Sequence, residues 1–230
     1  MKWRLLKGPW TDPHRNLVLE EAILSLTDAG KSPWTLRLWM NDRSVVVGVN
    51  QNLSDVKIGY CLENGIPVLR RVTGGGTVYQ DLRNLNWSVF APRDMVGCNV
   101  SSIYRTLSKP VVEAVRSLGA EAVYTPPNSI RVEGYKVSGM AAYVKRNVVL
   151  CHGTLLLDSD LNTMSEAIVV RDAVANLSTF VDVCLDEVQK AIVEAFEETF
   201  GIYLEEMGLT RAEVELHQRG GRSFRSSRLL

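Results

Sequence analysis

The sequence predicts an α+β fold with a mixed, mostly antiparallel β-sheet flanked by helices. Short strand-like segments follow one another in hairpin-like groups, whereas the longer amphipathic segments stand apart from them. The length of 230 residues, with 46% hydrophobic and 23% charged residues, suffices for one large folded domain. We expect that domain to span residues 1–210, and we expect residues 211–230 to form a basic, disordered tail.

The first third of the chain alternates between strand and helix patterns. Runs of β-branched or alternating apolar residues indicate strands, and an apolar period of three to four residues indicates helices. The expected strands are 1–12, at an edge of the sheet, 36–39, 44–48 and 67–71. The expected helices are 16–27, capped by Asn16, and 55–64, closed by Gly65.

The remaining elements follow from the same two patterns. A long helix begins at Ser101 or Ser102 and runs to about Leu118, and Pro110 inside it should kink or split it. Shorter helices are expected at 161–168 and at 186–200, the latter ended by Gly201. The expected strands are 76–90, 121–124, 129–132, 140–144 and 148–157, with a turn at 134–139 and a break at 151–153.

Charge and cysteine usage exclude several functions. The formal net charge is zero, which argues against binding nucleic acid without sequence specificity. No apolar stretch reaches transmembrane length and the N-terminus carries no hydrophobic signal region, so we expect no membrane association. The four scattered cysteines (Cys61, Cys98, Cys151, Cys184) form no CxxC pair and, with only three histidines, offer no metal site. They are typical of reduced, mostly buried thiols in a cytoplasmic protein.

The most distinctive stretch is RRVTGGGTVYQDLRNLNWS, residues 70–88. Gly74, Gly75 and Gly76 lack Cβ atoms, so their backbone N–H groups can approach a ligand closely. Arginines beside that backbone indicate an anionic ligand. The stretch matches neither GxxxxGK[ST] nor GxGxxG before a helix. A turn that joins two strands for purely geometric reasons remains the alternative.

Two further stretches carry candidate functional groups. Lys136 lies between Gly134 and Gly139, where its ammonium could hold one positive charge over a pocket; a solvated turn lysine is the alternative. His152 precedes Gly153 in a strand, which indicates close approach of another group, although a core histidine fits equally well. Cys151 is a weak nucleophile candidate, because adjacent strand residues point to opposite faces.

Together these stretches resemble the lipoate–protein ligases, which share a fold with biotin ligases and class II aminoacyl-tRNA synthetases. The resemblance runs from about residue 3 to residue 204 and includes NDRSVVVGVNQN, the glycine stretch, GYKVSG, HGTLLLDSDL and VANLSTFVDV. It is nearest to archaeal forms in which the catalytic domain and a small accessory domain are separate chains.

The resemblance implies a two-step reaction. ATP, with Mg²⁺, would activate lipoate as lipoyl-AMP, and a lysine on a lipoyl carrier domain would then accept the lipoyl group. The carrier would belong to a 2-oxoacid dehydrogenase or to a glycine-cleavage H-type protein, and a separate accessory subunit would assist. A transferase that uses a preformed acyl donor, an acyl-cysteine octanoyl transferase and a non-catalytic binder remain alternatives. A biotin ligase is disfavoured by the glycine stretch.

The resemblance also assigns roles to residues. Lys136 would lie between the two anions as the catalytic cation, Arg71 would add charge near the carboxylate, and the three glycines would wrap the acyl-phosphate junction. Gln80 stands where related ligases commonly have histidine, which leaves any role of an imidazole there in doubt. The other expected binding residues are Asp81, which would order the loop, Asn84 and Asn128 at the nucleotide, His152, Gly153, and Val45, Val47, Val72 and Val78 around the lipoyl tail.

Overall fold

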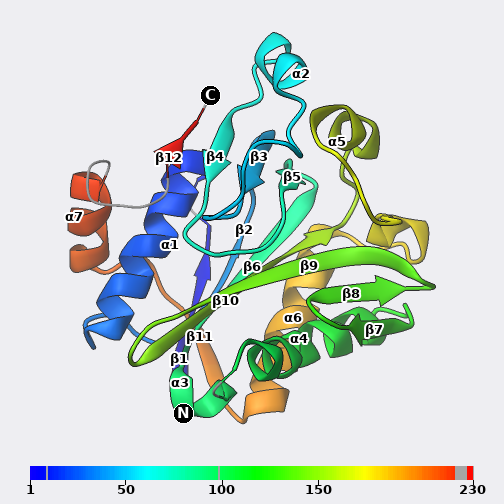
Figure 1. Ribbon diagram of the computed structural model, residues 1–230. Helices are drawn as coiled ribbons and strands as arrows, with labels where there is room; N and C mark the ends of the chain where they lie inside the picture. The colour runs from blue at the N-terminus through cyan, green and yellow to red at the C-terminus, as the bar shows by residue number, and fades with distance from the viewer. Residues whose placement is uncertain (9, 98, 221–226, 230) are drawn as a thin grey trace.

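In a computed structural model, which describes residues 1–8, 10–97, 99–220 and 227–229, the chain folds around an eight-stranded sheet (Figure 1). The strand order is β11-β1-β2-β6-β10-β9-β8-β7. β1 runs parallel to both of its neighbours and every other pairing is antiparallel, which confirms the mixed, mostly antiparallel sheet. The strands are β1 (Lys2–Lys7), β2 (Thr35–Trp39), β6 (Asn84–Pro92), β7 (Ala122–Thr125), β8 (Ser129–Val132), β9 (Tyr135–Val144), β10 (Val148–Leu156) and β11 (Tyr203–Glu206).

A second, smaller sheet carries the glycine-rich loop. Its order is β12-β4-β3-β5, with β3 parallel to β4 and antiparallel to β5. The strands are β3 (Ser44–Val47), β4 (Val68–Arg70), β5 (Val78–Gln80) and β12 (Ser227–Arg228). Because the glycines lie between β4 and β5, and β3 runs between those two strands, the loop crosses the end of β3.

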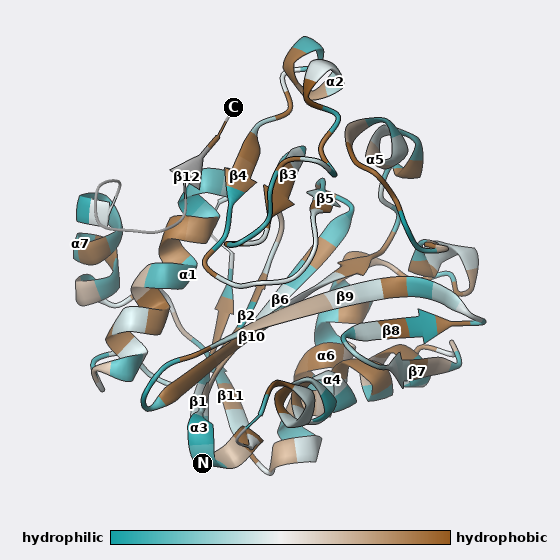
Figure 2. Ribbon diagram, in the orientation of Figure 1, coloured by the Kyte–Doolittle hydropathy of each residue, from teal (hydrophilic) through white to brown (hydrophobic). Residues whose placement is uncertain are grey.

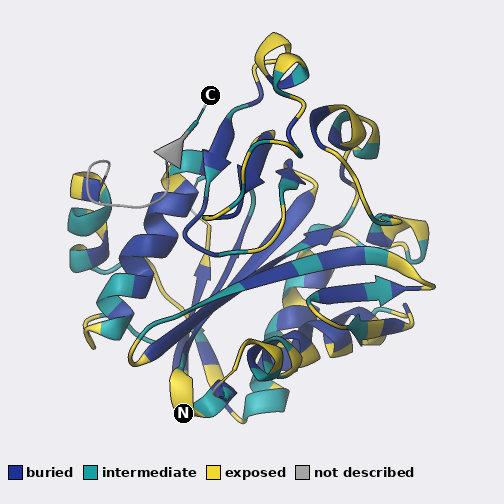
Figure 3. Ribbon diagram, viewed as in Figure 1, coloured by how far each residue is buried: buried dark blue, intermediate teal, exposed yellow. Residues whose placement is uncertain are grey.

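Helices cover both faces of the large sheet. α4 (Val100–Ser117) and α6 (Leu185–Phe200) pack together over the main hydrophobic core. α1 (Pro13–Asp28) covers the other face, where Leu19 and Ile23 pack against Phe90 and Leu150. Figure 2 shows many apolar residues along the strands of the sheet. Figure 3 shows that these strands and α1 are largely buried. The short helices are α2 (Ile58–Glu63), α3 (Arg93–Val96), α5 (Leu161–Ala167), a 3₁₀ turn (Leu177–Thr179) and α7 (Arg211–Arg219).

Several boundaries differ from the sequence-based expectations. β1 is an inner strand, because β11 near the end of the chain pairs with its outer side. Asp12, whose side chain accepts a 2.7 Å hydrogen bond from the N–H of Arg15, caps α1 in place of Asn16. Asn99 caps α4, and this helix continues unsplit through Pro110.

Lys136 lies in a strand, which corrects its expected place in a turn. The chain turns at Glu133 and Gly134, both with positive φ, and β9 begins at Tyr135. β10 likewise runs unbroken through Gly153. A Cβ atom at Gly153 would come within 2.6 Å of the ring of Trp87 on β6. Glycine here permits tight packing between neighbouring strands rather than a chain reversal.

The expectation of a disordered tail over residues 211–230 is wrong for residues 211–219 and 227–228. Thr210 caps α7 in a reciprocal capping box with Glu213, and α7 packs on α1 (Figure 1). The carboxylate of Glu213 accepts hydrogen bonds of 2.6 and 2.7 Å from Arg4, and both side chains are fully buried. The sequence gives no local sign of this contact, because its two halves lie 209 residues apart. Residues 221–226 and 230 lie outside the described residues.

No helix in the described ranges is both long and apolar enough to cross a lipid bilayer.

Candidate functional site

The glycine loop is held from inside by Arg71. Its guanidinium donates to the carbonyl oxygens of Gly74 and Gly76 at 2.6 and 2.8 Å, to that of Val46 at 3.1 Å, and to the hydroxyl of Thr73 at 2.9 Å. Burial lowers the pKa of Arg71 to about 10. The side chain thus fixes the loop from beneath, and most of its donors are already used within the protein.

Of the three loop glycines, all within the described part of the chain, only Gly75 has a positive φ, at 86°. A Cβ atom at Gly74 or Gly76 would meet open space. The tightest backbone contact lies across from the loop at Gly48, where a Cβ atom would clash with the carbonyl oxygen of Gly75. The bare backbone of Gly48 therefore sets how deeply the loop sits.

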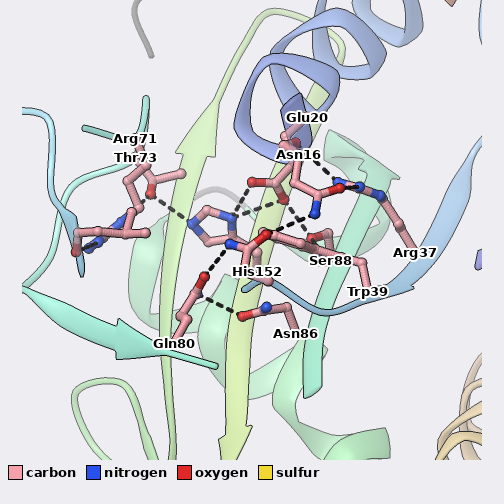
Figure 4. Close-up of polar contacts among 12 residues, drawn as sticks. Asn16, Glu20, Arg37, Trp39, Arg71, Thr73, Gln80, Asn86, Ser88 and His152 are labelled. Atoms are coloured by element: carbon pink, nitrogen blue, oxygen red, sulfur yellow. Dashed lines mark hydrogen bonds and ion pairs between the residues drawn. The ribbon is translucent and has the colours of Figure 1, made fainter. Parts of the chain in front are cut away.

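A buried hydrogen-bond network lies beneath this loop, with His152 at its centre (Figure 4). His152 Nε2 lies 2.8 Å from the hydroxyl of Thr73, and Nδ1 lies 3.0 Å from a carboxylate oxygen of Glu20 on α1. Burial alone would raise the pKa of Glu20, but His152 and Arg37 lower it, so the carboxylate is ionised. An ionised carboxylate only accepts, so Nδ1 of His152 carries a hydrogen. The histidine thereby ties α1 to the start of the glycine loop.

Gln80 belongs to an adjoining network of buried amides. Its side-chain oxygen accepts from Asn41 at 2.5 Å and its side-chain nitrogen donates to Asn86 at 2.8 Å. Asn86 also accepts a 3.1 Å hydrogen bond from Asn84. An amide can accept and donate in this way without carrying charge. In this chain the position therefore contributes neutral hydrogen bonding to the floor of the site.

Lys136 reaches over two cavities from β9. The smaller encloses about 110 Å³ and the larger about 280 Å³, and Lys136, Val78, Gly139 and Thr154 border both of them. The ammonium lies 3.9 Å from the carboxylate of Asp172. Burial lowers the pKa of Lys136 while Asp172 opposes that effect. One cation thus stands where the two cavities meet.

The two cavities differ in their walls. Trp39, Leu17, Val46, Met140 and Ala141 give the smaller one apolar walls, and the buried polar network closes it. The larger one combines the charged side chains of Asp55, Arg171 and Asp172 with Ser138, whose buried hydroxyl has no hydrogen-bond partner among the described residues. Its apolar lining includes Val137, Leu156, Met164, Ile168, Val169 and Val170. The smaller cavity suits a short apolar chain with a polar end, and the larger suits a bulkier group that can satisfy Ser138.

Of the four valines expected around the lipoyl tail, Val78 borders the two cavities and the other three do not. Val45 and Val47 pack in an apolar cluster with Val68 and Tyr79, and Val72 packs in the cluster beneath α1. Val46 lines the smaller cavity. Strand alternation explains the error, because neighbouring residues of β3 point to opposite sides. Val78 lines both cavities and stays a candidate for the wall around an apolar ligand.

The remaining predicted residues fall into two groups. Asn128, His152 and Gly153 line the smaller cavity, where Asn128 also donates to the carbonyl of Met140 at 2.7 Å. Asp81 accepts from the backbone N–H groups of Arg83 and Asp160 at 2.9 Å each, which orders the loop after β5. Asn84 is fully buried and donates a hydrogen bond to Asn86, which lines the smaller cavity, whereas Asn84 itself does not.

Cys151 lies on the opposite face of β10 from His152, as the sequence predicts. It is fully buried in the main core, and burial raises its pKa strongly. Its thiol therefore has neither the exposure nor the charge of a reactive cysteine.

Sequence reasoning missed Glu20, Trp39, Met140 and Asp172. Glu20, Trp39 and Asp172 lie far along the chain from the residues they contact; Glu20 and His152, for example, are 132 residues apart. Met140 directly follows the lysine motif, but its side chain carried no sign of a role in a cavity. The only available signal for Glu20 was a carboxylate on the apolar side of a helix, and such a residue needs a buried partner.

Comparisons with known proteins show which family the chain belongs to. The model of the lipoyl protein ligase A/B catalytic domain matches residues 12–197. Lipoate-protein ligase A subunit 1 of Thermoplasma acidophilum is 34% identical over 225 residues, covering 87% of this chain and 85% of that protein. The ligase LplJ of Bacillus subtilis is 35% identical over 185 residues; the match covers 74% of this chain but 54% of LplJ.

Two solved structures superpose closely. A crystal structure of lipoate-protein ligase A bound with ATP gives a TM-score of 0.88 at 33% identity, covering 95% of this chain and 94% of that one. A bipartite lipoate protein ligase from T. acidophilum, studied with its E2 lipoyl domain, gives 0.86 at 33% identity, with 95% and 91% covered. The family model, the relatives and the shared fold agree, and the chain belongs to the lipoyl protein ligase A/B catalytic-domain family.

Proposed function

We propose that this chain is the catalytic subunit of an ATP-dependent lipoate–protein ligase. The observation that carries the proposal is the position of Lys136 at the junction of a narrow apolar cavity and a larger one. Lipoate has an apolar tail and a carboxylate head, and ATP supplies an adenosine and a phosphate chain. The smaller cavity would take the lipoyl tail and the larger would take the nucleotide.

In the first step, a carboxylate oxygen of lipoate attacks the α-phosphorus of ATP. The bond from that phosphorus to the bridging oxygen breaks, pyrophosphate leaves, and lipoyl-AMP remains. Two anions must approach each other, and charge grows on the phosphate oxygens. The ammonium of Lys136 would neutralise that charge, since a fixed cation in a site shielded from water stabilises such a transition state strongly.

In the second step, the ε-amine of a carrier lysine attacks the acyl carbonyl of lipoyl-AMP. The bond from the carbonyl carbon to the phosphate oxygen breaks, AMP leaves, and the nitrogen loses a proton as the amide forms. Lys136 would stabilise the departing AMP as it stabilised the entering carboxylate. The loop at Gly74–Gly76, held by Arg71, would offer backbone N–H groups to the mixed anhydride. Asn128 was expected at the nucleotide, but it lines the smaller cavity and would lie beside the lipoyl end of the anhydride.

Mg²⁺ would enter with the phosphates of ATP. Among the described residues, no group of three or more His, Cys, Asp or Glu side chains could hold a metal ion. We expect phosphate oxygens and water to supply most of the ligands of Mg²⁺. When bound, Mg²⁺ would offset the charge of the phosphate chain.

The proposed protein partners are a lipoyl carrier domain and a separate accessory subunit. The name of the T. acidophilum relative, a subunit 1, and the bipartite ligase studied with an E2 lipoyl domain support this part of the proposal. A carrier of a 2-oxoacid dehydrogenase or of the glycine-cleavage H type would fit.

Mixing the purified chain with ATP, Mg²⁺, lipoate and a carrier domain tests the proposal, with and without the candidate accessory protein. Mass spectrometry should find lipoyl-AMP and then a carrier heavier by one lipoyl group. A parallel mixture supplied with synthetic lipoyl-AMP isolates the second step. If no mixture lipoylates the carrier, the ligase function is refuted; if only the lipoyl-AMP mixture does, the protein is a transferase.

Replacing Cys151 by alanine should leave the lipoylation rate unchanged within about twofold, because its thiol lies in the core away from the cavities. The rate of carrier lipoylation measures this effect, and thermal unfolding shows whether the variant is folded. A folded C151A protein without transfer activity would revive the acyl-cysteine mechanism.

Replacing Gly48 by alanine should lower kcat/KM for lipoyl-AMP formation by about 100-fold, because the new Cβ would push the carbonyl of Gly75 and shift the loop. Gly59→Ala, at an open position on α2, is the matched control and should retain activity. Pyrophosphate release measures both. Equal activity in the two variants would show that the depth of the loop does not matter.

A further inference from the structure

An ion pair between β8 and the segment after α5 lies beside Lys136. Arg131 on β8 donates from Nη2 to both carboxylate oxygens of Asp172 at 2.8 Å. Arg131 also donates from Nη1 to the carbonyl of Gly134 at 2.8 Å, which fixes the guanidinium against the turn before β9. The carboxylate of Asp172 is therefore held in place from the side of β8.

The same segment is joined to the backbone of Lys136. The N–H of Lys136 donates to the carbonyl of Ala173 at 2.8 Å, and the N–H of Ala175 donates to the carbonyl of Lys136 at 3.2 Å. This parallel bridge keeps Asp172 next to the lysine, with 3.9 Å between its carboxylate and Nζ. Both the backbone and Arg131 thus fix the position of Asp172 relative to the ammonium.

We propose that Asp172 and Arg131 are positioning residues with opposite effects on Lys136. Asp172 holds the ammonium charged and at the mouth of the two cavities; Arg131 anchors Asp172 while its own positive charge opposes that of the lysine. This inference rests on the proposed role of Lys136 as the cation of acyl-adenylate formation. The resemblance of the glycine and lysine motifs to ligases does not include either residue.

Electrostatics gives the two residues opposite signs. Burial is the main cause that lowers the pKa of Lys136; Asp172 raises it and Arg131 lowers it. Asp55 and Arg171 also line the larger cavity, but they pair with each other at 2.7 Å. His152 lines the smaller cavity and is bound to Glu20. Asp172 and Arg131 are therefore the charged groups expected to control Lys136.

The experiment compares Asp172→Asn with Arg131→Gln in the full chain. Each variant removes the same ion pair, yet they should affect Lys136 in opposite directions. Only a deprotonated amine reacts with acetic anhydride, so the pH dependence of acetylation at Lys136, followed by peptide mass spectrometry, reports its ionisation. The midpoint should move to lower pH in D172N and to higher pH in R131Q.

Asp55→Asn, which removes a different carboxylate of the larger cavity, should leave the midpoint unchanged. The alkaline limb of the rate of lipoyl-AMP formation should shift as the labelling midpoint does. Shifts in the same direction for D172N and R131Q, or no shift in either, would overturn the inference. Because labelling needs no turnover, an inactive wild-type chain would refute the proposed function while this measurement still decides the roles of Asp172 and Arg131.

Discussion

Replacing Lys136 by alanine should lower the rate of lipoyl-AMP formation by about two to three orders of magnitude, the loss typical when a fixed electrostatic group of an active site is removed. The ammonium borders both cavities, and none of its neighbours can replace it. Arg71 is occupied by loop carbonyl oxygens, and Arg131 is engaged by Asp172 and Gly134. Pyrophosphate release with saturating ATP and lipoate measures the effect.

Lys190→Ala on the exposed side of α6 is the control, because that lysine is 76% exposed and far from the cavities in the fold. It should match the wild type. The split between kcat and KM separates an enzyme from a mere binder. A Lys136→Ala variant that loses only nucleotide affinity, with kcat retained, would favour a protein that holds lipoyl-AMP without making it.

The sequence predicted the elements that local chemistry determines. The β-branched run at 44–48, the amphipathic helix at 186–200 and the glycine loop are each encoded by neighbouring residues, and the structure has them at nearly the same bounds. The lysine near Gly134 and Gly139 was also found, although it lies in a strand rather than in a turn. A glycine near the lysine fits a turn as well as the start of a strand, so the sequence alone did not distinguish these two structures.

Side-chain partners were much harder to predict, because they depend on register between distant segments. Arg71 was expected near the substrate carboxylate, but its guanidinium is directed at the loop's own carbonyl groups. Gln80 raised doubt as a missing imidazole, yet its side chain bonds two buried amides from two other parts of the chain, Asn41 and Asn86. Neighbouring residues of β3 point to opposite sides, so Val46 lines the cavity where Val45 and Val47 were expected.

The C-terminal helix provides the second large effect. Glu213→Ala should reduce the free energy of unfolding by about 3–5 kcal/mol, because it leaves the guanidinium of Arg4 buried without its carboxylate. Glu213 also accepts from the backbone N–H of Thr210 at 2.7 Å and from Ser32, so the variant loses one half of the capping box of α7 as well. Urea denaturation followed by circular dichroism measures the difference.

Glu215→Ala is a matched control two residues away. Its pair with Arg211 lies at the surface, with 93% of the arginine side chain exposed, and such pairs contribute less than about 1 kcal/mol. Burial would raise the pKa of Glu213, but Arg4 and the other donors lower it overall. The contribution of Glu213 should therefore be complete above the pKa of an unfolded glutamate and be lost as the pH falls through the folded value. If E213A and E215A had equal, small effects, the buried ion pair between Glu213 and Arg4 would contribute little to stability. α7 would then behave as an appendage of the core.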